Sequence, residues 1–304
     1  MNEEKLRVAV VQAASVFADS AASTEKAVAL LRQAAGNGAE LIVFPEAFLS
    51  GYPRGITFGT VVGSRSEQGR ELFARYQASA ITIPGPETRA LAEVAREAGV
   101  FLAMGVIEKD AGNPLGTLYC TLLYIDASGT VAGKHRKIKP TAAERIIWGE
   151  GDGSDFQAHN AGPARVAGLI CWENYMPLAR MALYEQGVTV YLAPTADNRD
   201  SWLATVRHIA CEGRCYVLSC NQFFTPEAYP EAFRAGLEYD ASQPFCRGGS
   251  AIISPAGEVL CGPVYDKEEI LYADLDLTGI ARARFDFDAI GHYNRPDIFE
   301  FRVK

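Results

Sequence analysis

The sequence predicts an α/β fold whose core is a mixed, two-layered sheet. Strand–helix–strand patterns occur in both halves of the 304-residue chain, and each half also contains a hairpin pattern. Such alternation is typical of α/β domains, in which helices cover the faces of a partly parallel sheet. Nothing resembling a linker or a low-complexity stretch separates the halves. We therefore expect a single domain over residues 1–304, with a short C-terminal tail.

Hydrophobic periodicity and turn residues indicate the elements of the first half. Ser23 is the expected N-cap of the first helix, and Pro86 and Gly99 are expected to begin and end the second. Residues 55–69 show no clear periodicity and are expected to form a loop. In chain order the expected elements are a strand at 6–12, a helix at 23–35, a strand at 41–44, a helix at 86–99, a strand at 100–106, and a hairpin of strands at 118–126 and 130–134.

The second half repeats this alternation. Asn174 is the expected N-cap of its first helix, because Asn is favoured at that position, and Pro177 is tolerated in a first helical turn. In chain order the expected elements are a strand at 166–170, a helix at 176–186, a strand at 189–193, a helix at 202–213, a strand at 216–220, a hairpin within 249–260, and a last strand at 269–273.

Composition and charge exclude several classes of function. With 48% apolar and 22% charged residues, the chain resembles an ordinary soluble globular protein. A net charge of −8 argues against a nucleic-acid or membrane surface, where a basic excess helps binding. No apolar run approaches the length of a transmembrane helix. The seven cysteines have no regular spacing, which indicates reduced thiols and a cytoplasmic protein.

No metal or cofactor is expected. Cys211 and Cys215 lie one helical turn apart, but no paired Cys or His ligands accompany them at zinc spacing, so packing is the expected role. The glycine-rich loop 148–153 has no strand leading into it at the spacing of a phosphate-binding or dinucleotide-binding loop. A nucleotide site is therefore rejected.

Cys171 occupies the turn between an expected strand and an expected helix. A thiol that faces the positive end of a helix has a lowered pKa, and nearby backbone N–H groups can bind an anion. Buried structural cysteines are also common, because free Cys is among the most buried residue types. Its placement alone does not decide between a nucleophile and a packing residue.

Two charged residues also lie at expected strand ends. Glu46 follows the strand at 41–44, where a buried carboxylate is costly without a partner, although a lone Glu after a strand is usually solvated. Lys137 belongs to a cationic run at 134–139, and such runs usually form a solvated face. Lys137 alternates with Ile138 just before a Pro-Thr turn, so an inward orientation is the alternative.

Three stretches follow one another along the chain, Val43-Phe-Pro-Glu46-Ala-Phe, His135-Arg-Lys137-Ile-Lys-Pro-Thr and Ile170-Cys171-Trp-Glu-Asn-Tyr-Met-Pro. Together they resemble the nitrilase superfamily of carbon–nitrogen hydrolases. The resemblance covers the whole chain, and it implies an α-β-β-α sandwich fold. It also implies a Glu46–Lys137–Cys171 triad, with Glu144 matching a second glutamate beside it. Two further stretches, 207–214 and 291–299, are similar to the nitrilase branch.

The implied chemistry suits these residue types. A thiolate is a strong nucleophile near neutral pH, so Cys171 is the expected attacking group on a nitrile carbon. Lys137, with the backbone N–H of Trp172, is expected to stabilise the charge that develops on nitrogen. Glu46 is the expected general base, and a dry pocket and the charge of Glu144 are expected to raise its pKa. A Cys–His mechanism is disfavoured because His135 is expected to point away from the face that carries Lys137.

The branch of the superfamily is inferred from the residues after the nucleophile. Trp172-Glu173-Asn174 stands where amidases and carbamoylases usually carry an Asp-containing pattern, so a nitrilase acting on a small nitrile is the expected function. The alternatives are an amidase or carbamoylase, a cyanide hydratase or dihydratase, a metal-dependent hydrolase, and a catalytically silent scaffold. Tyr52, Trp148 and Trp172 are candidate walls of the substrate pocket, with core packing as the alternative for each. The resemblance also implies a homodimer or small homo-oligomer.

Overall fold

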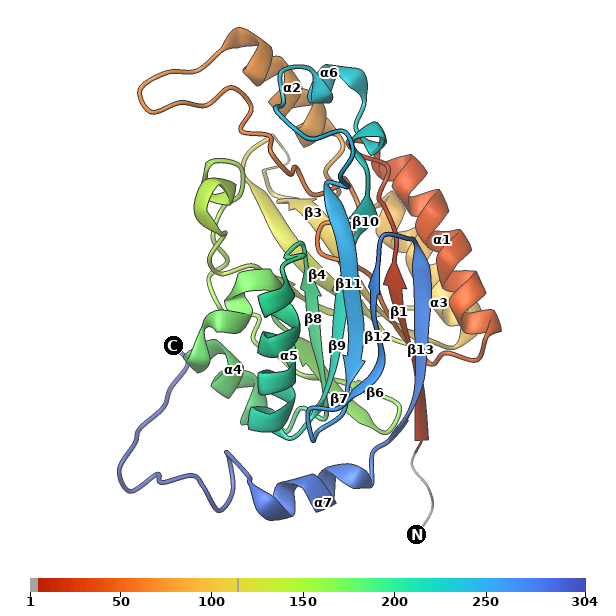
Figure 1. The fold of residues 1–304 in the computed structure, drawn as a ribbon, viewed down its shortest axis with the longest axis vertical. Coiled ribbons are helices and arrows are strands. Elements are labelled where there is room, and N and C mark those ends of the chain that lie inside the picture. Colours follow the sequence, from red (N-terminus) through yellow and green to blue (C-terminus); the bar gives the residue numbers. More distant parts are fainter. Residues whose placement is uncertain (1–4, 114) are drawn as a thin grey trace.

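Two mixed β-sheets lie face to face at the centre of the computed structural model, which describes residues 5–113 and 115–304 (Figure 1). In the first sheet, β1, β2 and β3 are parallel, and antiparallel strands extend it at both edges. Its order is β13 (Glu269–Asp276), β1 (Lys5–Gln12), β2 (Leu41–Val43), β3 (Phe101–Lys109), β4 (Leu118–Ile125) and β5 (Val131–Arg136).

The second sheet is built in the same way around parallel strands β7, β8 and β9. The strands at its edges, and β12 beside β11, are antiparallel to their neighbours. Its order is β10 (Phe223–Phe224), β11 (Cys246–Ile253), β9 (Tyr216–Asn221), β8 (Val190–Thr195), β7 (Ala164–Gly168) and β6 (His159–Ala161), with β12 (Val259–Tyr265) on the far side of β11.

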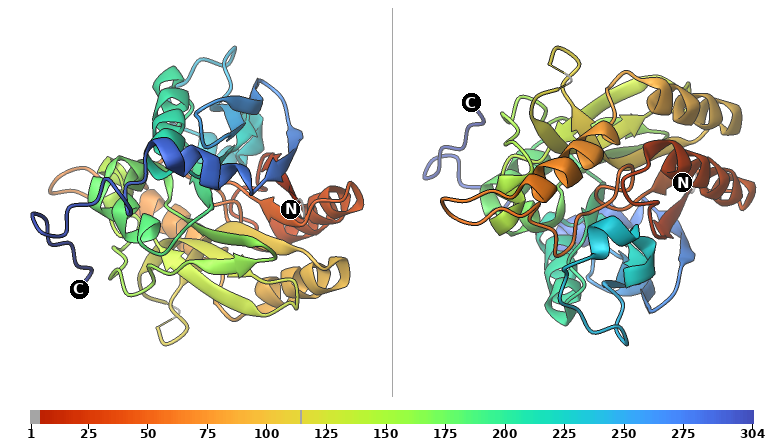
Figure 2. Two further views of the ribbon diagram at one scale, coloured as in Figure 1. Left: turned by 90° about the horizontal axis from the view of Figure 1, so that it is seen from below. Right: turned by 90° about the horizontal axis from the view of Figure 1, so that it is seen from above.

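Helices cover the outer face of each sheet, which completes the expected α-β-β-α sandwich (Figure 2). Shorter elements lie at the two ends of the sandwich (Figure 1). The outer helices are α1 (Ser20–Gly36) and α3 (Pro86–Ala98) on the first sheet, and α4 (Pro177–Tyr184) and α5 (Asp200–Gly213) on the second. The other elements are α2 (Glu67–Ala78), α6 (Glu231–Arg234), α7 (Gly279–Asp286), η1 (Ala142–Ile146), η2 (Cys171–Tyr175) and η3 (Pro226–Ala228).

Three apolar layers hold these four layers of backbone together. On β1, Val8 and Val10 belong to the layer between the sheets, whereas Ala9 and Val11 belong to the layer under α1 and α3. A third layer lies between the second sheet and α4 and α5. Because side chains alternate along a strand and both faces are covered, the central strands are apolar on both faces.

The expected strands are all present, and the largest differences concern helix starts. Helix α1 begins at Ser20 rather than at residue 23, because Asp19 is the N-cap and accepts a hydrogen bond from the Ala22 N–H at 2.9 Å. Ser23 instead lies inside the helix and donates to the carbonyl of Val16. Helix α2 was not expected, since within it only Gly69 and Tyr76 are buried and the apolar periodicity is weak.

One glycine allows the segment after β2 to pass close to β3. A Cβ at Gly105 would lie 2.0 Å from the carbonyl oxygen of Pro45 and 2.8 Å from the Cα of Glu46. Beyond this crossing, the Leu49 N–H donates to the Gly105 carbonyl at 3.1 Å. The missing side chain at residue 105 therefore determines how closely Glu46 approaches the sheet.

We expect Gly105→Ala to lower the free energy of unfolding by about 1–3 kcal/mol, because overpacking forces the backbone apart. Urea denaturation measures this loss. Gly36→Ala is the matched control, because a Cβ at Gly36 meets nothing within 4 Å. Gly105→Ala with the stability of the unmodified protein would show that the two segments are not in close contact.

Candidate active site

The first sheet contributes a buried carboxylate, that of Glu46, from the segment that follows β2. Its backbone carbonyl accepts a hydrogen bond from Gln222 Nε2 at 2.8 Å, and its side chain is fully buried. Oε1 lies 2.8 Å from Lys137 Nζ and 3.6 Å from Cys120 Sγ. Oε2 is buried and has no hydrogen-bond partner among the described residues. The solvated alternative for Glu46 is therefore wrong.

Lys137 directly follows β5 and points inward, which is the alternative orientation that its alternation with Ile138 allowed. Its N–H continues the strand pairing by donating to the Cys120 carbonyl at 2.8 Å. Its side chain is fully buried, with Nζ 2.8 Å from Glu46 and 2.7 Å from Glu144. The cationic run is solvated only in part, because Lys134 and Arg136 on the other side of the strand bind the buried carboxylate of Glu108.

Glu144 lies in the short helix η1 and joins three groups. Oε2 accepts hydrogen bonds from Lys137 Nζ at 2.7 Å and from the Thr141 N–H at 2.6 Å, while Oε1 accepts from the Tyr52 hydroxyl at 2.6 Å. The bond from the Thr141 N–H is one half of a capping box, and it holds the carboxylate at the start of the turn. Glu144 therefore lies beside Lys137, as the resemblance implied.

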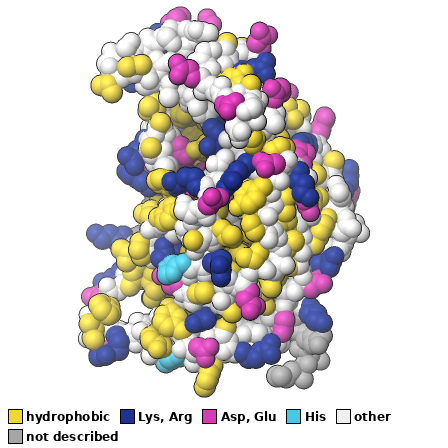
Figure 3. All heavy atoms as spheres, viewed as in Figure 1, with side chains coloured by type: hydrophobic (Ala, Val, Ile, Leu, Met, Phe, Trp, Pro, Cys, Tyr) yellow, Lys and Arg dark blue, Asp and Glu magenta, His cyan; other side chains and the backbone are white. Residues whose placement is uncertain are grey.

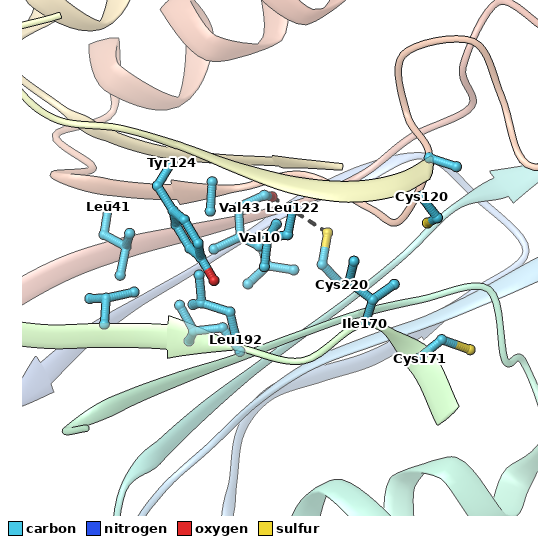
Figure 4. Packing of buried hydrophobic residues seen from close by; sticks show 14 of the residues in the cluster. Val10, Leu41, Val43, Cys120, Leu122, Tyr124, Ile170, Cys171, Leu192 and Cys220 are labelled. Carbon is cyan, nitrogen blue, oxygen red and sulfur yellow. Dashed lines mark hydrogen bonds between the residues drawn. The ribbon is translucent and has the colours of Figure 1, made fainter. Parts of the chain in front are cut away.

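Cys171 begins the short helix η2, three residues after β7 ends at Gly168. Figure 4 shows the Ile170 side chain pointing between the sheets and the Cys171 side chain lying beyond it. The Cys171 backbone has a φ of +52°, a strained left-handed conformation that recurs at functional sites. The Thr195 hydroxyl, at the end of the adjacent strand β8, donates to Cys171 Sγ at 3.1 Å.

Two expectations about this turn are wrong. Asn174 does not cap the following helix, which begins at Pro177 with Met176 as its N-cap. Asn174 instead holds η2, because its Nδ2 donates to the carbonyls of Leu169 at 2.9 Å and Cys171 at 2.8 Å. The pKa of the Cys171 thiol is not lowered by a helix end but raised, first by burial and then by the charge of Glu46.

Burial also shifts the pKa values of the other charged groups of the site. It raises the pKa of Glu46, with the charge of Glu144 acting in the same direction and Lys137 opposing. For Lys137, burial alone lowers the pKa, but the negative charges of Glu46, Cys171 and Glu144 raise it well above its ordinary value. A carboxyl group with a raised pKa beside a protonated amine can accept a proton near neutral pH and later return it.

His135 was expected to point away from the face that carries Lys137, and this expectation is wrong. Side chains two residues apart on a strand share a face, so His135 is buried on the same side as Lys137. Its Nδ1 lies 2.9 Å from Asp155, and its Nε2 lies 3.1 Å from Glu173. Because both ring nitrogens are occupied, His135 is not free to pair with the Cys171 thiol.

A hollow of about 260 Å³ opens beside Cys171. Two of the expected wall residues, Tyr52 and Trp172, line it, and Trp172 Nε1 donates to Asp197 at 2.9 Å. Trp148 is 3% exposed and packs against Tyr52 at a ring distance of 5.8 Å. Its place outside the lining favours the core alternative for Trp148.

Sequence reasoning missed several residues of this hollow. Arg54, Asp197 and Arg199 line it, and Thr195 contacts the sulfur. The carboxyl ends of neighbouring parallel strands meet at one edge of a sheet, so the end of the strand after Cys171 was a usable signal for Thr195. Arg54 and Arg199 lie in loops, and no sequence pattern marked them.

Within the part of the chain that the structure describes, no group of three or more His, Cys, Asp or Glu side chains is arranged to hold a metal ion. Over the same residues, no helix has the length and apolar character needed to cross a bilayer. All seven cysteines have free thiols, and Cys215 packs in the layer under α5, as expected.

The chain is similar in sequence to proteins of one known family. The model of the carbon–nitrogen hydrolase family matches residues 7–285. A protein named aliphatic nitrilase from Sinorhizobium fredii is 52% identical over 299 residues, which covers 98% of this chain and 96% of the relative. A bifunctional nitrilase/nitrile hydratase from Nicotiana tabacum is 51% identical over 98% of this chain and 86% of its own length.

A solved structure has the same fold. The carbon–nitrogen hydrolase from Helicobacter pylori is 20% identical and superposes with a TM-score of 0.73, covering 98% of each chain. At this identity the likeness concerns the fold alone.

We expect Glu144→Gln to lower the pKa of Glu46, because the negative charge of Glu144 is one cause of its raised value. NMR titration of ¹³Cδ-labelled glutamates, with the Glu46 signal assigned through Glu46→Gln, measures the shift. Glu150→Gln is the control, since Glu150 pairs with Lys139 at the surface. An unchanged or raised pKa of Glu46 in Glu144→Gln contradicts this electrostatic coupling.

Proposed function

This chain belongs to the carbon–nitrogen hydrolase family, and from that premise we propose that it is a nitrilase. It hydrolyses a small organic nitrile to the carboxylic acid and ammonia. The observation that carries the proposal is the match, at about half identity over 98% of the chain, to relatives that are named nitrilases. The buried thiol, amine and carboxylate beside the hollow are the groups that such a reaction needs.

Cys171 is the proposed nucleophile. Its sulfur bonds to the nitrile carbon as one π bond of the C≡N group breaks, and the nitrogen takes up a proton, which gives a thioimidate. Water adds to the thioimidate carbon, ammonia leaves, and a thioester remains. A second water releases the acid and regenerates the thiol. The sum is one nitrile and two waters giving one acid and one ammonia.

Glu46 is the proposed general base, and Lys137 the proposed electrostatic stabiliser. Glu46 takes the thiol proton and then activates each water. Its raised pKa favours this role, as does its Oε2 atom, which has no hydrogen-bond partner in the described part of the chain. Lys137, held between two carboxylates, stabilises the charge on the substrate nitrogen together with the Trp172 backbone N–H. Glu144 supports both residues by fixing the amine and keeping the pKa of Glu46 high.

Tyr52 and Trp172 are the proposed walls of the substrate pocket, since both line the hollow beside Cys171. Trp148 has only an indirect place in this proposal. It packs behind Tyr52, and Lys137 Nζ lies 5.8 Å from the centre of its ring. Trp148 therefore supports the positions of Tyr52 and Lys137 rather than contacting the substrate.

The same triad also suits an amidase or carbamoylase and a cyanide hydratase or dihydratase. The name of the Nicotiana tabacum relative supports a second outcome, in which the tetrahedral intermediate collapses to the amide. We propose that the acid is the main product and the amide a minor one. A silent scaffold is disfavoured by the close approach of a carboxylate and an amine beside a buried thiol.

We further propose a homodimer or small homo-oligomer in the cytoplasm, with residues 1–304 as a single domain. Residues 1–4 and 114 of that range lie outside the described residues. The segment that follows β13 exposes apolar side chains, among them Phe285, Tyr293, Ile298 and Phe299. Apolar side chains also gather at the lower left of Figure 3, where this segment lies, and an exposed apolar surface supports association. Seven free thiols suit a reducing compartment.

We expect Cys171→Ala to abolish ammonia release from nitriles and leave the fold intact, because removing one sulfur opens little cavity. The measurements are ammonia release, and circular dichroism as a check on folding. Cys211→Ala, which lies in α5 outside the site, is the control and should keep full activity. Substantial turnover by Cys171→Ala would overturn the covalent mechanism.

We expect kcat/KM to be higher for a nitrile than for the matching primary amide. A linear nitrile and a planar amide approach the sulfur along different paths, and misplacement by about an ångström costs roughly a hundredfold in rate. Ammonia release from matched pairs of an aliphatic, an aromatic and an arylacetic substrate measures the ratio and identifies the preferred class. A higher kcat/KM for every amide identifies an amidase instead.

A further inference from the structure

One buried carboxylate contacts both halves of the candidate site without lining the hollow. Glu173 lies two residues after Cys171, in η2, and its side chain is fully buried. Oε2 accepts a hydrogen bond from the Ile170 N–H at 2.7 Å, and Oε1 accepts from the Ile138 N–H at 2.7 Å. His135 Nε2 lies 3.1 Å from the same group.

The two backbone donors belong to different sheets. Ile170 directly precedes Cys171 on the segment that leaves β7, and Ile138 directly follows Lys137 on the segment that leaves β5. Glu173 therefore joins the residue before the sulfur to the residue after the amine. Each bond is charge-assisted, which makes it roughly twice as strong as a neutral hydrogen bond.

A positively charged imidazole ring lies against this carboxylate in the dry interior. The pKa of His135 is raised to about 10, because the attraction of Glu173 and Asp155 outweighs burial, which alone would lower it. Asp155 in turn accepts a hydrogen bond from the Arg136 N–H at 2.7 Å, so the second carboxylate beside the imidazole is held against β5. Glu173 and His135 thus form a buried ion pair that spans the two sheets.

We propose that Glu173 is a positioning residue that sets the separation between the Cys171 sulfur and the Lys137 amine. The proposal rests on the roles assigned above to Cys171 and Lys137. Glu173 acts only through two backbone N–H groups, one next to Cys171 and one next to Lys137, and His135 acts through Glu173. The expected consequence is a role in the chemical step and not in substrate binding, because Glu173 is absent from the described lining of the hollow.

Glu173→Gln keeps the size of the side chain but replaces one oxygen by an NH₂ group. That group then faces the N–H of Ile138 or of Ile170, so one of the two backbone bonds is lost. A shift of about an ångström at a reacting centre costs on the order of a hundredfold in rate. We expect kcat to fall by about that factor and KM to change by less than about threefold.

The test counts intact sites as well as turnover. Iodoacetamide labelling of Cys171, followed by mass spectrometry, gives the number of accessible nucleophiles, so that kcat is expressed per site. A positioning role predicts full labelling with a low kcat per site. Glu185→Gln, an exposed glutamate just after α4, is the matched control and should retain the kcat of the unmodified protein.

A purely structural role gives the opposite pattern, with fewer labelled sites or a lower Tm but an unchanged kcat per site, and this result overturns the proposal. Glu173→Asp is the second variant, since it keeps the charge and is too short to reach both N–H groups. We expect the same loss of kcat from it. If neither variant folds, the positioning role is rejected in favour of a structural one.

Two further measurements separate this proposal from the proposed function. An active Cys171→Ala variant shows that Cys171 is not the nucleophile, and it rejects the proposed function and the positioning role together. A fully active Glu173→Gln variant, with an inactive Cys171→Ala variant, rejects the positioning role alone. In the double variant His135→Asn/Glu173→Gln, the loss should be close to that of Glu173→Gln, because both residues act through one contact. Additive losses contradict the assignment of His135.

Discussion

The site depends on one buried ammonium group, that of Lys137. Burying a carboxylate is costly unless a partner compensates it, and this single cation lies within 2.8 Å of two carboxylates. One positive charge cannot fully neutralise two negative ones. The excess remains on Glu46, where burial and Glu144 keep the proton affinity high. The attraction of Lys137 therefore holds the cluster together, and the uncompensated negative charge makes Glu46 able to exchange a proton.

The sandwich brings the members of this cluster to one edge. Glu46 leaves β2 and Lys137 leaves β5 in the first sheet, whereas Cys171 leaves β7 and Thr195 ends β8 in the second. None of these residues approaches the others along the sequence. The approach comes from two sheets packed on a shared apolar layer, so the distances between reacting groups are controlled by core packing as well as by local hydrogen bonds.

Much of this arrangement was predictable from the sequence, and the exceptions have physical causes. Apolar strands covered on both faces have a strong signal, and the stretches around Glu46, Lys137 and Cys171 identified those residues. Two predictions were wrong because tertiary contacts override local preference. Asn174 does not cap α4, because its side chain bonds to its own turn. The pKa of the Cys171 thiol is raised and not lowered, because burial is its main cause. The contact between Glu173 and His135 crosses the two sheets, and no single stretch of sequence encodes it.

Strand β13 pairs along its whole length with β1, from Lys5 opposite Asp276 to Gln12 opposite Glu269. The two strands are separated by nearly the entire chain, and closing so long a loop carries a large entropic cost before any contact repays it. During synthesis on the ribosome, β1 therefore remains an unpaired edge until the last strand has emerged. The nascent chain exposes that edge for most of its translation, and an unpaired strand edge is a template for aggregation at the stage when the chain is most vulnerable.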